Sequence, residues 1–229
     1  MDLKILFLDN HLLVINKPPG ILSQSDITGD EDILSYCKSY IKDKFNKPGK
    51  VYTGLVHRLD RPVSGVMVLA RTSKAASRLS NQFRENSIKK FYLAIVEGKC
   101  KGEGVCRDYL QKQNQTTKIV KKEKQNSKYA ELKWTGITDQ DKNSLLDVEP
   151  KTGRPHQIRV QLAHIGFPIL GDLRYGAQRS FDGKNLALQC YAIEIEHPVR
   201  KEKMKWLAKP PTSWRKYFAN DCRIIINRG

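Results

Sequence analysis

The apolar residues of this chain fall mostly in short runs separated by turn residues, and this pattern favours a fold rich in β-strands. Two such runs flank Asp9-Asn10 near the N-terminus, which predicts a hairpin of residues 5–8 and 12–16. Two prolines and a glycine at 18–20 then force the chain out of regular structure. Further strands are predicted over residues 54–56, 66–70, 90–96, 130–135, 145–149 and 192–196.

Three other stretches have features typical of helices. Residues 30–45 carry apolar side chains at helical intervals, and Thr72 or Ser73 can cap a second helix. In the third stretch, Pro155 suits the first turn of a short helix and Gly166 suits its C-terminal cap. The apolar face of this third helix is expected to consist of Ile158, Leu162 and Ile165.

The charge of the chain points to its class of partner. With 229 residues, the chain is long enough for one large domain or two small lobes. It has 41 Lys and Arg residues against 24 Asp and Glu residues, which gives a formal net charge of +17. Lys and Arg displace counterions from phosphate polymers and so supply affinity that does not depend on sequence. Solubility requires a smaller excess, and nucleic acid is therefore the leading partner.

The cysteines and the N-terminal apolar runs indicate a reduced, cytoplasmic protein. Five cysteines are an odd number and form no C-x-x-C pair, which argues against a zinc knuckle and against a complete disulfide framework. The residues Asp9-Asn10-His11 divide the N-terminal apolar runs, so neither a secretion signal nor a membrane span is expected there.

A carboxylate lies between two arginines in the segment HRLDRPVSG at 57–65, which falls between two predicted strands. Nearby guanidinium groups favour the ionised form of Asp60, and an ionised carboxylate can act as a nucleophile. Loops held by a sheet often carry reactive residues. The alternative is that Asp60 forms only a surface salt bridge with one of the flanking arginines.

The segment KTGRPHQIRVQLAHIG at 151–166 places Arg159 at the edge of a buried helix face. A buried charge without a partner is costly, so Arg159 needs an anion, and Asp60 is the candidate. The histidines at 57, 156 and 164 show no H-E-x-x-H motif and no i,i+4 pair. Hydrogen bonding to phosphate or backbone is therefore favoured over metal binding.

The stretch from Lys112 to Lys128 is polar and contains six lysines. Two interpretations stay open for it. It is either a solvated hairpin tip or a loop that contacts RNA.

Six strings occur together and in order: NKPPG at 16–20, HRLD at 57–60 with Ser64-Gly65, KKFYLAIVEG at 89–98, TGRPHQIRVQLAHIG at 152–166, PILGDLRYG at 168–176, and His197-Pro198. Any one of them is weak evidence, but six in the right order are specific. The chain resembles the RluA family of pseudouridine synthases over nearly its whole length.

This resemblance implies an enzyme that isomerises uridine to pseudouridine within RNA, with no cofactor and no metal. It implies that Asp60 is the catalytic carboxylate, that Tyr92 packs against the uracil and can transfer a proton, and that Arg159 pairs with the catalytic Asp. Arg58 is expected to hold the target nucleotide out of the RNA. Substrate-binding roles are expected for Lys17, His57, Arg58, Arg154, His156 and Gln157.

The resemblance also implies an α+β pseudouridine synthase fold, in which a mixed, mostly antiparallel central sheet with flanking helices forms two lobes around a central cleft. Residues 1–229 are expected to form a single catalytic domain without the S4 RNA-binding module of many relatives. The expected partner is a stem-loop of ribosomal or transfer RNA, with no DNA and no membrane, and the expected state is a monomer in the cytoplasm.

Two positions depart from the family pattern. Pro62 and Val63 precede Ser64-Gly65 where relatives often have an acidic residue and Thr, and Gln189-Cys190 stands where they have His-Ala. Two rival functions remain open. A non-catalytic RNA-binding or ribosome-assembly factor would not need Asp60, Tyr92 and Arg159 together, and a hydrolase or nuclease would release uracil or cut the RNA.

Overall fold

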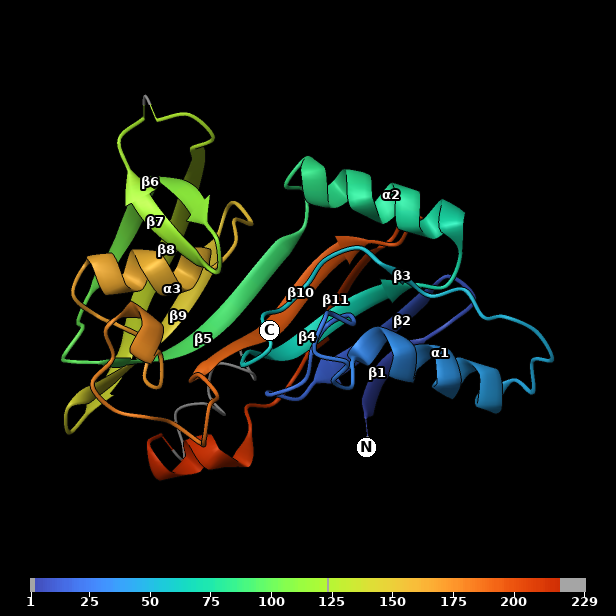
Figure 1. The fold of residues 1–229 in the computed structure, drawn as a ribbon, viewed down its shortest axis with the longest axis horizontal. Coiled ribbons are helices and arrows are strands. Elements are labelled where there is room, and N and C mark those ends of the chain that lie inside the picture. The colour runs from blue at the N-terminus through green and yellow to red at the C-terminus, as the bar shows by residue number, and fades with distance from the viewer. Residues whose placement is uncertain (1–2, 123, 219–229) are drawn as a thin grey trace. The chain divides into compact units, whose positions relative to one another are not determined.

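A computed structural model describes residues 3–122 and 124–218 of the chain. The chain forms two compact units (Figure 1). The first unit consists of Met1–Ile88 and Ala192–Ala208, and the second consists of Lys89–Tyr191 and Lys209–Gly229. The expected α+β class is confirmed, because strands predominate and a few helices accompany them in each unit.

The first unit is built on an N-terminal hairpin, as predicted. Its elements are β1 (Lys4–Leu8), β2 (Leu12–Lys17), α1 (Ile33–Lys44), β3 (Gly54–Leu55), β4 (Ser64–Ala70), α2 (Ser73–Arg84), the part of β10 (Leu188–Glu196) from Ala192 onward, and β11 (Lys203–Leu207). β2 pairs antiparallel with β1 and β4, and β11 pairs antiparallel with β10. Every residue of β4 is buried, as expected for a central strand.

Both helices of the first unit begin directly after a capping residue. Thr72 caps α2 as predicted, whereas α1 is capped by Asp32 and begins at Ile33, three residues after the predicted start. The Asp32 carboxylate accepts a hydrogen bond from Ser35 N–H at 2.9 Å, and the Thr72 hydroxyl accepts one from Ala75 N–H at 3.1 Å. α2 then buries Leu79 against strand residues of a core that includes Val66, Val68 and Ile193. Burial of this helix face stabilises the unit through the hydrophobic effect.

The late His197-Pro198 string ties two turns of the first unit together. His197 is completely buried, and its Nδ1 accepts the N–H groups of Val199 and Arg200. Because Nδ1 accepts, the ring proton lies on Nε2, which is 3.0 Å from the Asp9 carboxylate. The turn between β10 and β11 is thereby held to the turn between β1 and β2.

The second unit is an antiparallel array in the order β5-β9-β8-β6-β7. Its elements are β5 (Lys89–Glu97), β6 (Glu103–Gln113), β7 (Thr116–Val120), β8 (Lys128–Gln140), β9 (Asn143–Pro150), α3 (Gln157–His164), the short helices Leu173–Tyr175 and Thr212–Lys216, and the residues of β10 up to Tyr191. α3 lies beside the strands of this unit (Figure 1). Its Val160 packs against Leu110 of β6 and Ala130 of β8.

Two expectations for the second unit need correction. β6 and β7 were not predicted, because their residues are mostly polar, and only a few side chains such as Leu110 and Thr117 are buried. The polar stretch from Lys112 is therefore largely a hairpin, which turns at Asn114 with a φ of 51°. The second correction concerns α3. It begins at Gln157 rather than at Pro155, because His156 adopts a left-handed conformation with a φ of 53°.

The C-terminal end of α3 agrees with the sequence in one respect and differs in another. Gly166 follows the helix with a φ of 89°, the conformation that a terminating glycine supplies. Ile158 and Leu162 are buried, but Ile165 is 36% exposed and so does not belong to the buried face. Ile165 lies beyond the last helical residue, where the helical spacing no longer applies.

Four cysteines are free and buried, and the fifth, Cys222, lies outside the described residues. Within the described part of the chain, no helix has the length and hydropathy that crossing a membrane requires.

Candidate functional site

The Asp60 side chain lies on a turn of the first unit that the backbone closes on itself. Val63 N–H donates a hydrogen bond to the Asp60 carbonyl at 3.0 Å. Leu59 and Val63 are buried on either side, whereas Asp60 is half-buried and Arg61 is exposed. The buried neighbours anchor the turn, so the Asp60 carboxylate is presented at a fixed place.

Lys17 holds this turn from inside the first unit. Its side chain is completely buried, and Nζ donates to the carbonyl groups of Pro18 at 3.0 Å, Arg61 at 3.1 Å and Val63 at 2.9 Å. Burial lowers the pKa of the Lys17 ammonium to about 7, and the Asp60 charge opposes that shift. Lys17 is therefore a positioning residue of the turn, and substrate binding by its ammonium stays a prediction without a supporting contact.

Three further residues fix the turn from outside. The Ser23 hydroxyl donates to the Leu59 carbonyl at 2.6 Å and accepts Leu59 N–H at 3.2 Å. Gly20 N–H donates to the Arg61 carbonyl at 2.8 Å, and Arg61 Nε donates to the Gly20 carbonyl at 2.9 Å. The Arg61 guanidinium also pairs with Asp30 at 2.7 Å. No sequence pattern indicated Ser23 or Asp30, because their contacts join segments far apart in the chain.

His57 and Arg58 precede the turn and differ sharply in environment. His57 Nε2 accepts Val68 N–H at 2.9 Å, and the imidazole stacks on Phe83 with ring centroids 4.7 Å apart. The ring thereby links the turn to β4 and α2, which is a structural role. Arg58 is exposed, as a residue that reaches toward a nucleic acid must be.

In the second unit, alternation along β5 places Lys90 and Tyr92 on one face and Phe91 and Leu93 on the other. The Tyr92 hydroxyl is hydrogen-bonded to the thiol of Cys190, a residue that is only 1% exposed. Burial raises the pKa of Cys190 to about 12, so its thiol is protonated at neutral pH. The phenol of Tyr92 thus has a neutral, fixed neighbour.

Arg159 is buried and forms a two-pronged ion pair with Asp172. Nε donates to Oδ2 at 2.7 Å and Nη2 donates to Oδ1 at 2.8 Å, and Asp172 itself is 1% exposed. The guanidinium also lies over the Tyr175 ring, 5.0 Å from its centroid. The sequence motifs suggest Asp60 as the anionic partner of Arg159 and give no sign of the Asp172 pair, although Asp172 lies in the PILGDLRYG string.

The His156 side chain at the start of α3 is hydrogen-bonded to Tyr175. Its Nδ1 lies 2.8 Å from the Tyr175 hydroxyl, which also accepts Thr117 N–H at 2.8 Å. This chain of bonds connects β7, the Leu173–Tyr175 helix and the start of α3.

Gln157 and Arg154 shape the loop before α3. Gln157 Oε1 accepts the Thr152 hydroxyl at 2.7 Å and Arg154 N–H at 3.0 Å, and Nε2 donates to the Glu131 carbonyl at 3.0 Å. The buried Gln157 amide is thus occupied within the protein and organises the loop. Arg154 Nε donates to the Tyr129 carbonyl at 2.9 Å.

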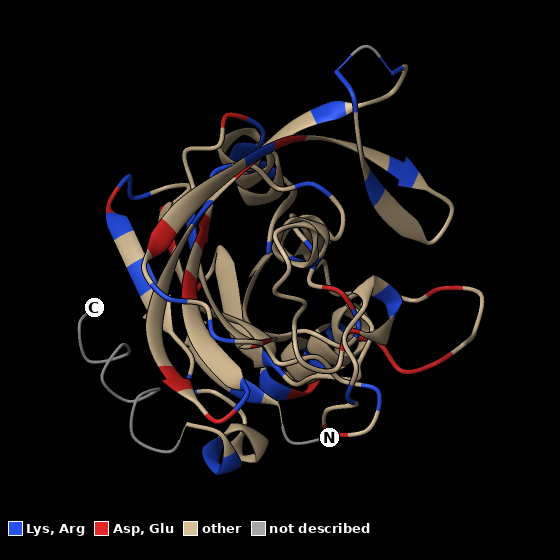
Figure 2. Cartoon of the chain, turned by 90° about the vertical axis from the view of Figure 1, so that its left-hand side faces the viewer, with Lys and Arg blue, Asp and Glu red and all other residues tan. Residues whose placement is uncertain are grey.

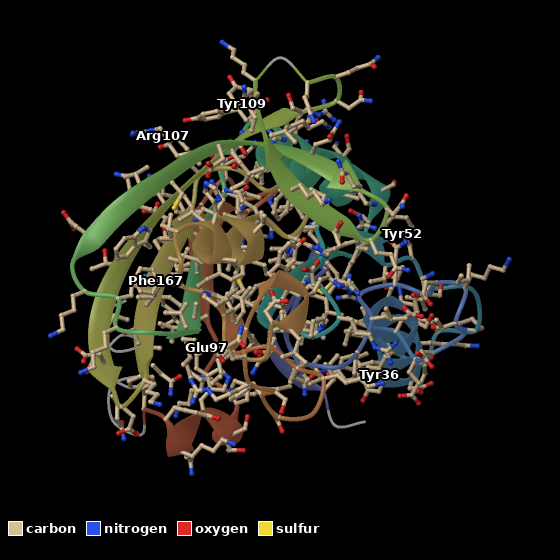
Figure 3. All side chains as sticks on the ribbon, turned by 60° about the vertical axis from the view of Figure 1, so that its left-hand side comes forward. Tyr36, Tyr52, Glu97, Arg107, Tyr109 and Phe167 are labelled. Carbon is tan, nitrogen blue, oxygen red and sulfur yellow. The ribbon has the colours of Figure 1, made fainter. Side chains whose placement is uncertain are left out.

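The β6–β7 hairpin and the loop that follows it carry several basic residues, whose positions are blue in Figure 2. We call this segment the basic hairpin. Tyr109 of β6 meets Tyr129 of β8 edge to face at 5.8 Å, and Tyr109 and Arg107 both extend from β6 (Figure 3). The exposed lysines of the basic hairpin are Lys112, Lys118, Lys121, Lys122, Lys124 and Lys128. Lysines interleaved with aromatic rings are typical of nucleic-acid contacts.

Across residues 3–122 and 124–218, no group of three or more His, Cys, Asp or Glu side chains could hold a metal ion. His57 and His156, two of the three histidines considered in the sequence, instead have hydrogen-bonding partners within their own units.

Comparison with known proteins identifies similar chains. The sequence profile described as RNA pseudouridylate synthase matches residues 11–164, which include Asp60, Tyr92 and Arg159. The chain is 33% identical to the ribosomal large subunit pseudouridine synthase D of Borreliella burgdorferi over 212 residues, which are 90% of this chain and 64% of that protein. It is 31% identical to the tRNA pseudouridine synthase C of Haemophilus ducreyi over 236 residues, with 95% of each covered.

Among solved structures, the human RNA pseudouridylate synthase domain containing 4 has the same fold. The TM-score is 0.79 at 23% identity, with 93% of this chain and 92% of that chain covered. The chain spans less than two thirds of the Borreliella protein but nearly all of the Haemophilus protein.

Proposed function

Because this chain belongs to the RNA pseudouridylate synthase family, we propose that it isomerises uridine to pseudouridine within structured RNA. The resemblance to the RluA family that the sequence motifs carry is confirmed by the same matches. The observation that carries the proposal is the Asp60 turn. Lys17, Ser23 and Gly20 hold its backbone from three directions, so the carboxylate is preorganised for one task.

Asp60 is the proposed catalytic residue. Cleavage of the bond between N1 and C1′ develops positive charge on the ribose, which an ionised carboxylate stabilises or attacks. The uracil leaves as a delocalised anion, so no partner acid is needed. It then rotates and rebonds through C5 to C1′ in a site from which water is excluded.

Tyr92 and Arg159 complete the proposed catalytic set. After C5 bonds to C1′, C5 must lose its surplus proton while N1 takes one up, and the Tyr92 phenol is the candidate that helps this transfer. Its hydrogen bond to Cys190 fixes the direction in which the hydroxyl points. Arg159 supplies a positive charge whose position Asp172 holds rigidly, and pairing of that charge with Asp60 in the catalytic state is part of the proposal.

The substrate proposed is a stem-loop of ribosomal or transfer RNA. The target atom is inaccessible inside a stacked helix, so the nucleotide is unpaired or flipped out, and the exposed Arg58 holds it there. The basic hairpin supports RNA binding by the same chain. We propose that the protein acts as a monomer in the cytoplasm without a cofactor.

The decisive experiment uses total cellular RNA that lacks the modification. Wild-type protein and Asp60→Asn are incubated with it, and pseudouridines are mapped by carbodiimide-dependent stops of reverse transcription. We expect new sites with the wild type and none with Asp60→Asn. Equal yields from both proteins, or no new site, would sink the proposal. RNA binding without modification would favour an assembly factor, and free uracil or cut RNA would favour a hydrolase.

A further inference from the structure

Lys90 is a half-buried cation on the same face of β5 as Tyr92. Two residues along a strand are about 7 Å apart, so the two side chains stand next to one another. The Lys90 Nζ packs against Gly153, 3.3 Å from the position that a Cβ would occupy there. A Cβ at 153 would require the ammonium to shift by only a few tenths of an ångström, so the contact places Nζ directly beside the loop before α3 without making the glycine essential.

The Lys90 ammonium has no anionic partner in the second unit. Among residues 3–122 and 124–218, no hydrogen bond or ion pair joins Nζ to a protein group. Burial lowers the pKa of Lys90, and the nearby Arg154 charge lowers it further. Cys190 acts in the opposite direction, but its thiol is protonated at neutral pH. The fold thus keeps a partly desolvated cation without compensation, which is costly.

Arg154 stands in the same situation. Its Nε is bound to the Tyr129 carbonyl, a neutral acceptor, and no carboxylate of the described chain pairs with its guanidinium. The two cations are therefore close enough to repel one another, and no carboxylate of the described residues pairs with either of them. Such an arrangement lowers the stability of the free protein. An anion that binds there interacts favourably with both cations at once.

We propose that Lys90 and Arg154 together bind a backbone phosphate of the RNA that flanks the uridine at Tyr92. Lys90 supplies a compact point charge for a phosphate oxygen, and Arg154 supplies donors in a planar fork. The inference deepens the proposed function and rests on it for the identity of the anion. In this proposal, Lys90 helps the protein to prefer a uridine within an RNA chain over a free nucleoside, because only the RNA chain has the flanking phosphate.

The first test measures affinity and its dependence on salt. A short fluorescein-labelled RNA stem-loop with uridines in its loop is titrated with wild type, Lys90→Gln, Lys90→Arg and the exposed control Lys99→Gln. We expect Lys90→Gln to bind about tenfold more weakly and to reduce the slope of log K against log salt by about 0.7–0.9. Lys90→Arg retains most of the affinity, and Lys99→Gln behaves like the wild type.

The second test measures thermal unfolding without RNA. A binding cation that lacks a partner weakens the free protein, so Lys90→Gln is expected to leave Tm unchanged or to raise it. A marked loss of Tm in both Lys90→Gln and Lys90→Arg would assign Lys90 a structural role and overturn the proposal. The same conclusion follows if Lys90→Gln keeps wild-type affinity and salt slope.

Turnover separates the phosphate site from the reaction itself. If Lys90→Gln binds RNA like the wild type but forms no pseudouridine, Lys90 acts on the base and the phosphate assignment is wrong. If the wild type forms no pseudouridine but Lys90→Gln still loses affinity and slope, the proposed reaction fails and the phosphate site stands.

Discussion

Lys17 is the residue on which the geometry of the Asp60 turn depends most. Its ammonium is completely buried, and its three donors reach three carbonyl groups. A long side chain that loses its rotamer freedom and its hydration is retained only where those bonds repay the cost. The sequence shows only a lysine before two prolines, and its burial follows from β2 lying against β4.

Replacement of Lys17 by Met removes those three donors while keeping much of the side-chain volume. We expect the free energy of unfolding to fall by about 2–4 kcal/mol, because buried carbonyl groups lose their partner. Urea denaturation at pH 6 measures the change. The exposed Lys99→Met serves as control and should stay within about 0.5 kcal/mol of the wild type. A Lys17→Met protein as stable as that control would contradict the proposed anchoring role.

The pH dependence of stability gives an independent check on Lys17. Its pKa is about 7 in the folded protein, below the ordinary 10.5, so the unfolded chain binds more protons between these values. The contribution of Lys17 to stability therefore rises with pH across that window. Denaturation at pH 7, 8, 9 and 10 should show the difference between wild type and Lys17→Met growing with pH. Parallel profiles of the two proteins would refute the lowered pKa.

Variants of the Arg159–Asp172 ion pair can distinguish the contribution of Arg159 to folding stability from its contribution to catalysis. Asp172→Ala leaves a buried guanidinium without its carboxylate and should cost about 3–5 kcal/mol in unfolding free energy. The double variant Arg159→Met, Asp172→Leu removes both charges and should recover most of that loss. Pseudouridine formation should stay absent in the double variant. A stable double variant with wild-type turnover would show that Arg159 has no catalytic part.

At the scale of elements, one hydroxyl connects β7 with the start of α3. The Tyr175 hydroxyl accepts the N–H of Thr117 and is hydrogen-bonded to His156, while its ring lies under the Arg159 guanidinium. β7 is the last strand in the order of the second unit, so no strand of the described residues pairs with its outer backbone groups. Tyr175 gives this edge one bond that replaces a strand partner.

Tyr175→Phe should therefore loosen this connection locally. Without the hydroxyl, Thr117 N–H loses its acceptor, and we expect a loss of about 1–3 kcal/mol. Hydrogen exchange followed by NMR should show faster exchange of the Thr117 amide. Tyr40→Phe, whose hydroxyl contacts only the exposed Lys44 side chain, provides a matched control that should leave this amide unchanged. Unchanged protection of Thr117 in Tyr175→Phe would argue against the connection.

At the scale of the whole molecule, a net charge of +17 supplies affinity for RNA without choosing a sequence. The basic hairpin contains six exposed lysines on one supersecondary element. Charge of this kind acts at long range and is screened by salt, unlike the partly buried charge of Lys90. Experiments should therefore distinguish the contribution of the basic hairpin to RNA affinity from that of Lys90.

The triple variant Lys118→Gln, Lys121→Gln, Lys122→Gln removes three of the exposed charges on the basic hairpin. We expect weaker binding to every RNA tested, a salt slope reduced by up to about 2, and unchanged turnover at saturating RNA. Titrations at several salt concentrations, with turnover at saturation, check this. An unchanged salt slope would show that the hairpin is only a solvated tip, the alternative that the sequence left open.

The sequence by itself determined the elements with a strong period, the net charge and the family. The helix cap at Thr72, the N-terminal hairpin and the motifs around Asp60 and Arg159 depend on residues close together in the chain, so their patterns are visible in the sequence. The sequence does not indicate β6 and β7, because strands with mostly polar side chains lack the alternation that is typical of a half-buried strand.

Only the tertiary structure decided which groups meet. Arg159 is paired with Asp172, Lys17 is buried under the Asp60 turn, and Lys90 lies beside Gly153 with no anionic partner among the described residues. The physical reason is that burial and pairing depend on distances between segments that folding brings together. A sequence shows the charge that a side chain carries, but the fold determines whether water, a carboxylate or nothing in the protein compensates that charge.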